Sequence, residues 1–233
     1  MKTTREQIAQ RYNDLLDDAS RGFKKGLCDV DALLDDSTDT RRGVTLLFRP
    51  DLEVKKQIKL FLSEFDKIES GQYLYPESDI HVTISSIISA HENFSLDQIK
   101  PEQYVSVIKQ SLNEIKPFKI EFTGVTASPS SIIIQGYPLD DQLWSLREQL
   151  KINFYASGLL QNIDSRYSLI TAHSTVVRFR KKLARPKKVV DLLQKYRKYN
   201  FGISHIKKVE FVLNDWYQKE ELSPTISSFK LNS

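Results

Sequence analysis

Two of the four histidines in the chain begin the same short pattern, in which a threonine follows two residues later. The patterns are HVTI at residues 81–84 and HSTV at residues 173–176. Because residues i and i+2 of a strand point to the same side, each pattern would present an imidazole beside a hydroxyl. An imidazole exchanges protons near neutral pH, and a threonine hydroxyl donates a hydrogen bond without adding charge.

Two such units that face each other would hold the groups that cleavage of a phosphodiester requires. One of His81 and His173 would accept a proton from the attacking water or hydroxyl, and the other would protonate the leaving oxygen. Thr83 and Thr175 would stabilise the phosphoryl oxygens as negative charge develops. A single pattern of this kind would more often be structural, so the hypothesis depends on the second pattern.

The surrounding sequence predicts equivalent places for the two patterns. The order strand, helix, histidine-containing strand, helix, strand occurs twice, in residues 42–127 and again in 128–233, as an architectural repeat. We therefore predict an α+β fold with two lobes and pseudo-twofold symmetry. Its two antiparallel or mixed sheets would face a central cleft, with helices outside.

Several local predictions follow from the hydrophobic pattern. Residues 169–179 and residues 203–213 each read as one strand, and strict alternation would place Ser85 on the same face as His81 and Thr83. Residues 1–41 are expected to form an appendage, with an amphipathic helix at 3–20 followed by a stretch rich in Asp, Ser and Thr.

Composition narrows the class of protein. The 233 residues include one cysteine, which permits no intramolecular disulfide and suits a reducing compartment. The beginning of the chain lacks the apolar segment of a signal peptide, and no apolar run is long enough to cross a bilayer. We therefore expect a cytoplasmic protein without membrane contact, and a monomer. The sequence has no phosphate-binding glycine loop and no zinc-ligand spacing, so we expect neither a metal nor another cofactor.

Charge is distributed unevenly around a net value of +4. Residues 14–39 contain eight aspartates, whereas residues 178–208 contain twelve Lys or Arg and one acid, Asp191. Such segments can be solvated faces of opposite sign. The alternative is a basic surface beside the second pattern that attracts a phosphate-bearing ligand.

The pair of His-x-Thr-hydrophobic patterns, one in each lobe, resembles the two-histidine (2H) phosphoesterase superfamily. That superfamily includes bacterial RNA 2′,5′-ligase-like proteins and 2′,3′-cyclic nucleotide phosphodiesterases, and the resemblance covers about residues 43–231. It implies a metal-independent enzyme that acts on phosphodiester bonds in RNA ends or cyclic nucleotides. By motif match, His81 and His173 take the acid and base roles, and Thr83 and Thr175 bind the phosphate.

The resemblance adds a substrate-binding candidate and two differences. Bacterial ligase-like members often carry an arginine shortly after the second motif, where this chain has Arg178. Strict alternation turns Arg178 away from His173, so it contributes only if the strand bulges or ends there. Ser174 replaces the usual aliphatic residue, and the minimal fold has no counterpart of residues 1–41.

Three functions remain open from the sequence. The leading hypothesis is a phosphodiesterase that hydrolyses a 2′,3′-cyclic phosphate or a 2′,5′-linked nucleotide or RNA end. The alternatives are an RNA- or nucleotide-binding protein of the same fold without significant turnover, and an RNA 2′,5′-ligase. For base stacking, the candidates are aromatic residues at 73, 75, 137, 216 and 217.

Overall fold

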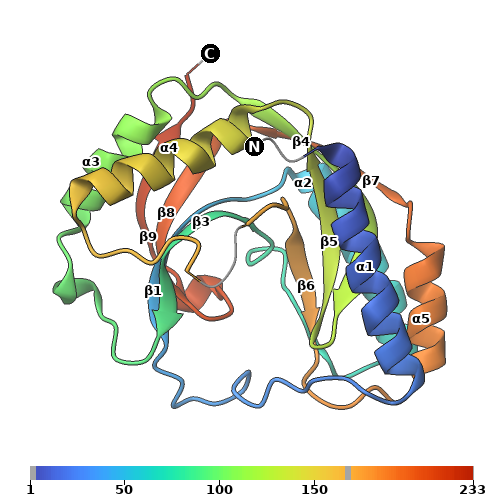
Figure 1. The fold of residues 1–233 in the computed structure, drawn as a ribbon. Helices are drawn as coiled ribbons and strands as arrows, with labels where there is room; N and C mark the ends of the chain where they lie inside the picture. Colours follow the sequence, from blue (N-terminus) through green and yellow to red (C-terminus); the bar gives the residue numbers. More distant parts are fainter. Residues whose placement is uncertain (1–3, 166–168, 233) are drawn as a thin grey trace.

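The computed structural model describes residues 4–165 and 169–232, so residues 1–3, 166–168 and 233 of the predicted units lie outside it. Two antiparallel sheets face each other in an α+β fold, which confirms the predicted class (Figure 1). The first sheet has the order β3-β1-β8-β9, with strands Val82–His91, Arg42–Phe48, Lys208–Asp215 and Thr225–Lys230. The second has the order β2-β6-β5-β4-β7, with strands Tyr73–Leu74, Ser174–Arg178, Ser131–Pro138, Phe118–Ser128 and Asn200–Ile206.

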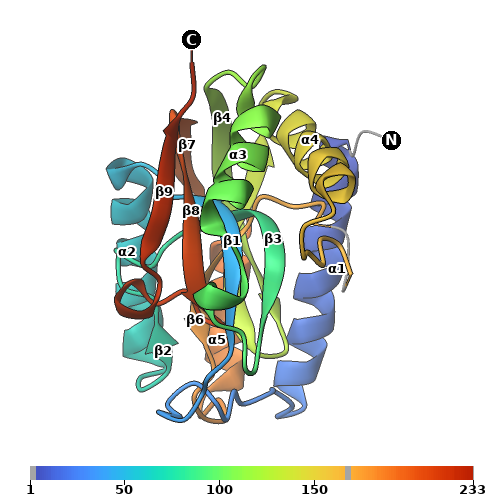
Figure 2. The ribbon, with the colours of Figure 1, turned by 90° about the vertical axis from the view of Figure 1, so that its left-hand side faces the viewer.

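Helices cover the outside of both sheets. Two of them, α3 (Pro101–Leu112) and α4 (Gln142–Ser157), pack against each other beside the first sheet, whose strands lie side by side in Figure 2. On the second sheet lie α1 (Arg5–Lys24), α2 (Leu52–Ile68) and α5 (Pro186–Lys195). Among the described residues, no helix combines the length and the apolar character that a membrane span requires.

The predicted repeat of elements is present, but the two sheets do not each correspond to one repeat, because strands cross between them. The order is β1-α2-β3-α3-β4 and then β5-α4-β6-α5-β7. Strand β4 pairs with β5 and β7 in the second sheet, and β8 pairs with β1 in the first. The sequence boundary between residues 127 and 128 therefore separates two repeat units and not two sheets.

The single strand predicted for residues 203–213 is wrong. The chain leaves the second sheet after Ile206 and enters the first at Lys208, so this segment contributes to both β7 and β8. Buried residues continue on both sides of the junction, at Ile206 and Val209. Hydrophobic alternation reports which face is buried, and it does not report a change of pairing partner.

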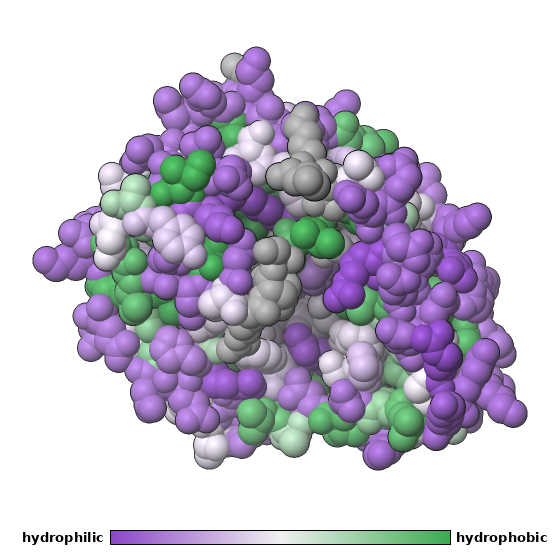
Figure 3. All heavy atoms as spheres, in the orientation of Figure 1, coloured by the Kyte–Doolittle hydropathy of each residue, from purple (hydrophilic) through white to green (hydrophobic). Residues whose placement is uncertain are grey.

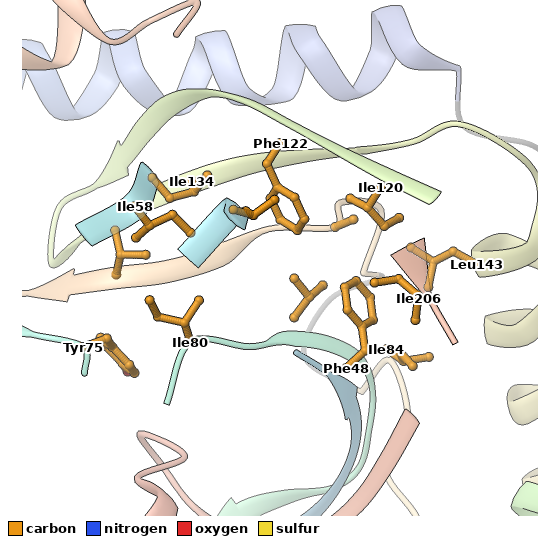
Figure 4. Packing of buried hydrophobic residues seen from close by; sticks show 14 of the residues in the cluster. Phe48, Ile58, Tyr75, Ile80, Ile84, Ile120, Phe122, Ile134, Leu143 and Ile206 are labelled. Carbon is orange, nitrogen blue, oxygen red and sulfur yellow. The ribbon is translucent and has the colours of Figure 1, made fainter. Parts of the chain in front are cut away.

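The two sheets share a hydrophobic core at one end of the molecule. Figure 4 shows Phe48 and Ile84 of the first sheet packing toward Ile120 and Ile206 of the second. The Phe48 and Phe118 rings meet edge to face, with their centroids 5.9 Å apart. This packing fixes the position of the first histidine-containing strand, β3, relative to the second sheet.

The N-terminal segment is packed onto the second sheet along its whole helix. Thr4 and Gln7 form a capping box at the start of α1. The buried Tyr12 hydroxyl donates to the main-chain carbonyl of Gly136 in β5, at 3.2 Å. After α1 the chain reaches the end of β6, where the Asp31 N–H donates to the Phe179 carbonyl at 2.9 Å.

Candidate active site

The two sequence patterns lie together at a cleft between the sheets. His81 directly precedes β3, and His173 directly precedes β6. Both histidines, Thr83 and Thr175 line one cleft of about 500 Å³. The cleft opens on the face shown in Figure 3, which is hydrophilic over most of its area and hollowed near its centre. Within the described part of the chain, neither threonine hydroxyl has a hydrogen-bond partner, so both can bind a ligand.

A β-bulge occurs at the same point of both patterns. In β3, Leu46 and Leu47 of β1 are paired with Ser85 and Thr83, so Ile84 is the extra residue. In β6, Ile132 and Ile133 of β5 are paired with Val177 and Thr175, so Val176 is the extra residue. A bulge places two residues opposite one and resets the alternation that follows. The aliphatic residue that ends each pattern is therefore the bulged residue.

The bulge changes which side chains face the cleft after Thr83. Strict alternation predicted Ser85, which is among the residues that line the cleft but is only 6% exposed, and the half-buried positions are Thr83, Ser86 and Ser89. Ser85 is paired with Leu46 and Thr83 with Leu47, so their side chains point to opposite faces. A second register shift near Ile87 produces the spacing of three residues. The prediction that Ser85 shares the face of Thr83 is therefore wrong, because it assumed a regular strand.

The bulge at Val176 has the same effect on Arg178, which lines the cleft. Its Nε donates to the Tyr75 hydroxyl at 3.2 Å, and its Nη1 lies 3.7 Å from Oδ2 of Asp31. Asp31 in turn accepts the Tyr217 hydroxyl at 2.8 Å. An arginine held in place by a phenol and a carboxylate can bind a phosphoryl oxygen without reorganising.

His81 is held by a main-chain carbonyl. Its Nδ1 lies 2.6 Å from the carbonyl oxygen of Asp79. Because a carbonyl only accepts, Nδ1 must carry the proton, and Nε2 of the neutral ring is left as an acceptor. Burial lowers the pKa of His81 to about 4, although the bond to Asp79 opposes that shift.

His173 is held by a hydroxyl. Its Nδ1 lies 2.7 Å from Oγ1 of Thr171, which can donate or accept. When Thr171 donates, the neutral ring carries its proton on Nε2. Burial lowers the pKa of His173 to about 4, and the charges of Arg147, His81 and Arg178 lower it further. The strand that carries the second pattern is also shorter than predicted, because β6 begins at Ser174 and not at residue 169.

Arg147 on α4 is a residue that sequence reasoning did not single out. Its guanidinium donates to the carbonyls of Thr83 and Ile84, at 3.0 and 2.9 Å. It also donates to the carbonyls of Leu169 and Thr171, at 3.0 and 2.9 Å. No local pattern marks this arginine, because all four acceptors are main-chain atoms distant in sequence.

The candidate stacking residues divide into two groups. Tyr75, Trp216 and Tyr217 line the cleft, and so does Trp144, which was not a candidate. Tyr137 packs edge to face on Tyr12 under α1, with the centroids 5.5 Å apart. Tyr73 packs edge to face on Tyr75, with the centroids 5.1 Å apart, and is not among the residues that line the cleft.

The basic segment after the second pattern lies mostly away from the cleft. Of its twelve Lys and Arg residues, Arg178 lines the cleft, and α5 lies on the outer face of the second sheet (Figure 1). Among the residues that the structure describes, the other basic side chains along the cleft wall are Arg147 and Lys151 of α4. Among the described residues, no group of three or more His, Cys, Asp or Glu side chains is arranged to hold a metal ion.

Comparisons with solved structures identify proteins with a similar fold. Escherichia coli LigT crystallised with 3′-AMP is similar at a TM-score of 0.56 and 10% identity, over 83% of this chain and 99% of that one. The chain has the LigT fold. A crystal structure described as a phosphoesterase aligns over the same shares, at a TM-score of 0.51 and 11% identity. A protein of Thermus thermophilus aligns at a TM-score of 0.59 and 13% identity, over 82% of this chain and 97% of that one.

These similarities establish the fold of the chain. No protein-family model matches the chain, and no curated protein matches its sequence.

Proposed function

We propose that the protein is a two-histidine phosphodiesterase that cleaves a 2′,3′-cyclic phosphate or a 2′,5′-linked nucleotide at an RNA end without a metal. The observation that carries the proposal is the pair of His-x-Thr units in one cleft, each followed by a bulge at the equivalent residue. The LigT fold supports it, and crystals of LigT itself contain 3′-AMP in one case and ATP in another.

The hydrogen bonds of the two imidazoles favour different roles. His81 presents an unprotonated Nε2, because the Asp79 carbonyl fixes the proton on Nδ1, so it is suited to be the base. His173 is suited to be the acid in its doubly protonated form, in which Nδ1–H donates to the Thr171 hydroxyl and Nε2–H is given to the leaving oxygen. This assignment applies to hydrolysis, and the roles reverse for ligation.

Hydrolysis then balances across the cleft. Water attacks the phosphorus and gives its proton to Nε2 of His81, as the new P–O bond forms. The bond from phosphorus to the leaving ribose oxygen breaks, and that oxygen takes the proton from Nε2 of His173. Thr83, Thr175 and Arg178 stabilise the non-bridging oxygens as their charge grows.

The low pKa values of both histidines are those of the ligand-free site. An anionic phosphate between the two rings favours their protonated forms, so binding raises both pKa values toward neutrality. The proton that His173 gives to the leaving oxygen is therefore more available in the complex than in the free protein.

Turnover of 2′,3′-cyclic nucleotides and of a 2′,5′-linked oligonucleotide, each with EDTA present, tests the proposal. We expect turnover that survives the chelator and has a bell-shaped dependence on pH. Binding of nucleotides without turnover would support the binding-protein alternative. A strict need for a divalent metal would contradict the proposed mechanism.

A further inference from the structure

The carbonyls of the two bulged residues are equivalent in the repeat, but they are satisfied in different ways. The Val176 carbonyl in β6 accepts the main-chain N–H of Tyr75 at 3.0 Å. The Ile84 carbonyl in β3 accepts Nε of Arg147 at 2.9 Å. A buried carbonyl needs a donor, and a bulge disrupts the ladder that normally supplies one. In the first unit, a side chain from α4 therefore takes the place of a neighbouring strand.

The same guanidinium also reaches the segment that precedes the second pattern. It donates to the carbonyl of Thr83 and to the carbonyls of Leu169 and Thr171, with all three distances between 2.9 and 3.0 Å. Leu169 and Thr171 precede β6 and lie outside its ladder. A planar guanidinium with five N–H groups in fixed directions can span such a set of acceptors, whereas a lysine ammonium has three donors on one atom.

Two of the four acceptors belong to residues with a direct relation to the chemistry. Thr83 carries one of the hydroxyls that line the cleft, and the Thr171 hydroxyl contacts Nδ1 of His173. Fixing both main-chain segments to one rigid group sets the distance between the first phosphate-binding hydroxyl and the second imidazole. Catalytic groups have to be held within about 0.5 Å of their productive places.

We propose that Arg147 is a positioning residue, which locks the two His-x-Thr units in register through the carbonyls of Thr83, Ile84, Leu169 and Thr171. This inference rests on the proposed function, because register matters only if the two units act on one phosphate. Arg147 takes no proton and forms no bond in the reaction.

Arg147→Lys and Arg147→Met separate the hydrogen bonds from the charge. Arg147→Lys keeps the positive charge but loses the planar set of N–H donors. We therefore expect kcat on a 2′,3′-cyclic nucleotide to fall about 100-fold, with KM rising far less. Arg147→Met loses both, so kcat falls at least as far. Thermal melting and circular dichroism establish first that each variant is folded. If Arg147→Met does not fold, the kinetics of Arg147→Lys alone test the positioning role.

Proton NMR titration of the histidines gives a readout that a purely structural role would not change. The charged groups that act on His173 are Arg147, His81 and Arg178. We expect its pKa to rise in Arg147→Met and to stay low in Arg147→Lys. The matched control is Lys109→Met on α3, an exposed residue that is not among those that line the cleft and whose loss should leave the His173 titration unchanged.

Binding of inorganic phosphate tests register without turnover. In the wild-type protein, phosphate should shift the resonances of His81 and His173 with one shared dissociation constant. In Arg147→Lys we expect weaker binding, and two histidine responses that no longer coincide.

The outcomes distinguish this inference from the proposed function. Arg147→Lys with a kcat within threefold of wild type, or with a wild-type response to phosphate, would overturn the role of Arg147 alone. Wild-type protein that binds phosphate through both histidines but turns over no phosphodiester would contradict the proposed function, while the phosphate titration of the variants still decides the role of Arg147.

Discussion

The strands β3 and β6 carry the same pattern in the same local geometry, yet they supply different chemical groups. Each begins directly after its histidine, places a threonine in the cleft and bulges at the next residue. Three residues after the threonine, the bulge returns a side chain to the cleft, which is Ser86 in β3 and Arg178 in β6. The repeat therefore fixes the positions of these side chains, and the residue types at those positions give the two strands different chemical groups.

The histidines differ in the same way. His81 is bonded to a carbonyl, which permits one tautomer, and His173 to a hydroxyl, which permits two. The strand with the second pattern also carries Arg178, whose guanidinium is held by Tyr75 and Asp31. A nearly symmetric scaffold therefore presents two different sets of groups, which suits the asymmetric reaction that we propose, with proton acceptance on one side and proton donation with charge stabilisation on the other.

Removal of either imidazole should have the largest effect. We expect His81→Ala and His173→Ala each to lower kcat by about 10³-fold, within the range that acid–base groups contribute. The double variant should be little worse than either single one, because the two groups act as a unit. Steady-state kinetics at pH 7 check this. The remaining histidines, His91 and His205, are exposed and serve as matched controls, and a comparable loss in their Ala variants would contradict the assignment.

Exchange of the equivalent residues after the bulges should have a smaller and unequal effect. Arg178→Met should lower kcat/KM about 100-fold, because it removes a preorganised donor to the phosphoryl oxygens. Ser86→Ala should lower it less than tenfold. Equal losses in both variants would show that the two strands do not divide the work as proposed.

Stability should depend on pH through both histidines. Each has a folded-state pKa of about 4 against 6.5 when exposed, so the unfolded chain binds more protons between these values. The free energy of unfolding should therefore be highest above pH 6.5 and fall as pH decreases to 4, by at most about 3 kcal/mol for each imidazole. Urea unfolding between pH 4 and pH 7 measures this slope. If the free energy of unfolding of a double His81→Gln and His173→Gln variant depended on pH with the same slope, the attribution of the slope to these two histidines would be contradicted.

The sequence selected four residues that the structure brings to one cleft, but it missed much of what surrounds them, for physical reasons. His81, Thr83, His173 and Thr175 could be selected because their types and spacing repeat, and the predicted elements placed them equivalently. The bulges at Ile84 and Val176 were not predicted, since a bulge depends on the pairing of a neighbouring strand.

The same limit explains the other errors. Ser85 was placed on the wrong face, and Arg178 could be a candidate only on condition of a bulge. The switch of the chain from β7 to β8 left no signal in the hydrophobic pattern. Arg147 was missed because its acceptors are main-chain carbonyls, which look the same at every position of a sequence.

The different roles of the two histidines can be tested most directly with a nucleoside 3′-(4-nitrophenyl phosphate), whose nitrophenolate leaves without protonation. The measurement compares the activity of His81→Ala and His173→Ala on this substrate with their activity on a 2′,3′-cyclic nucleotide. The account predicts that the activated leaving group restores most of the activity of His173→Ala and little of that of His81→Ala. Equal recovery in both variants, or recovery in His81→Ala alone, would contradict it.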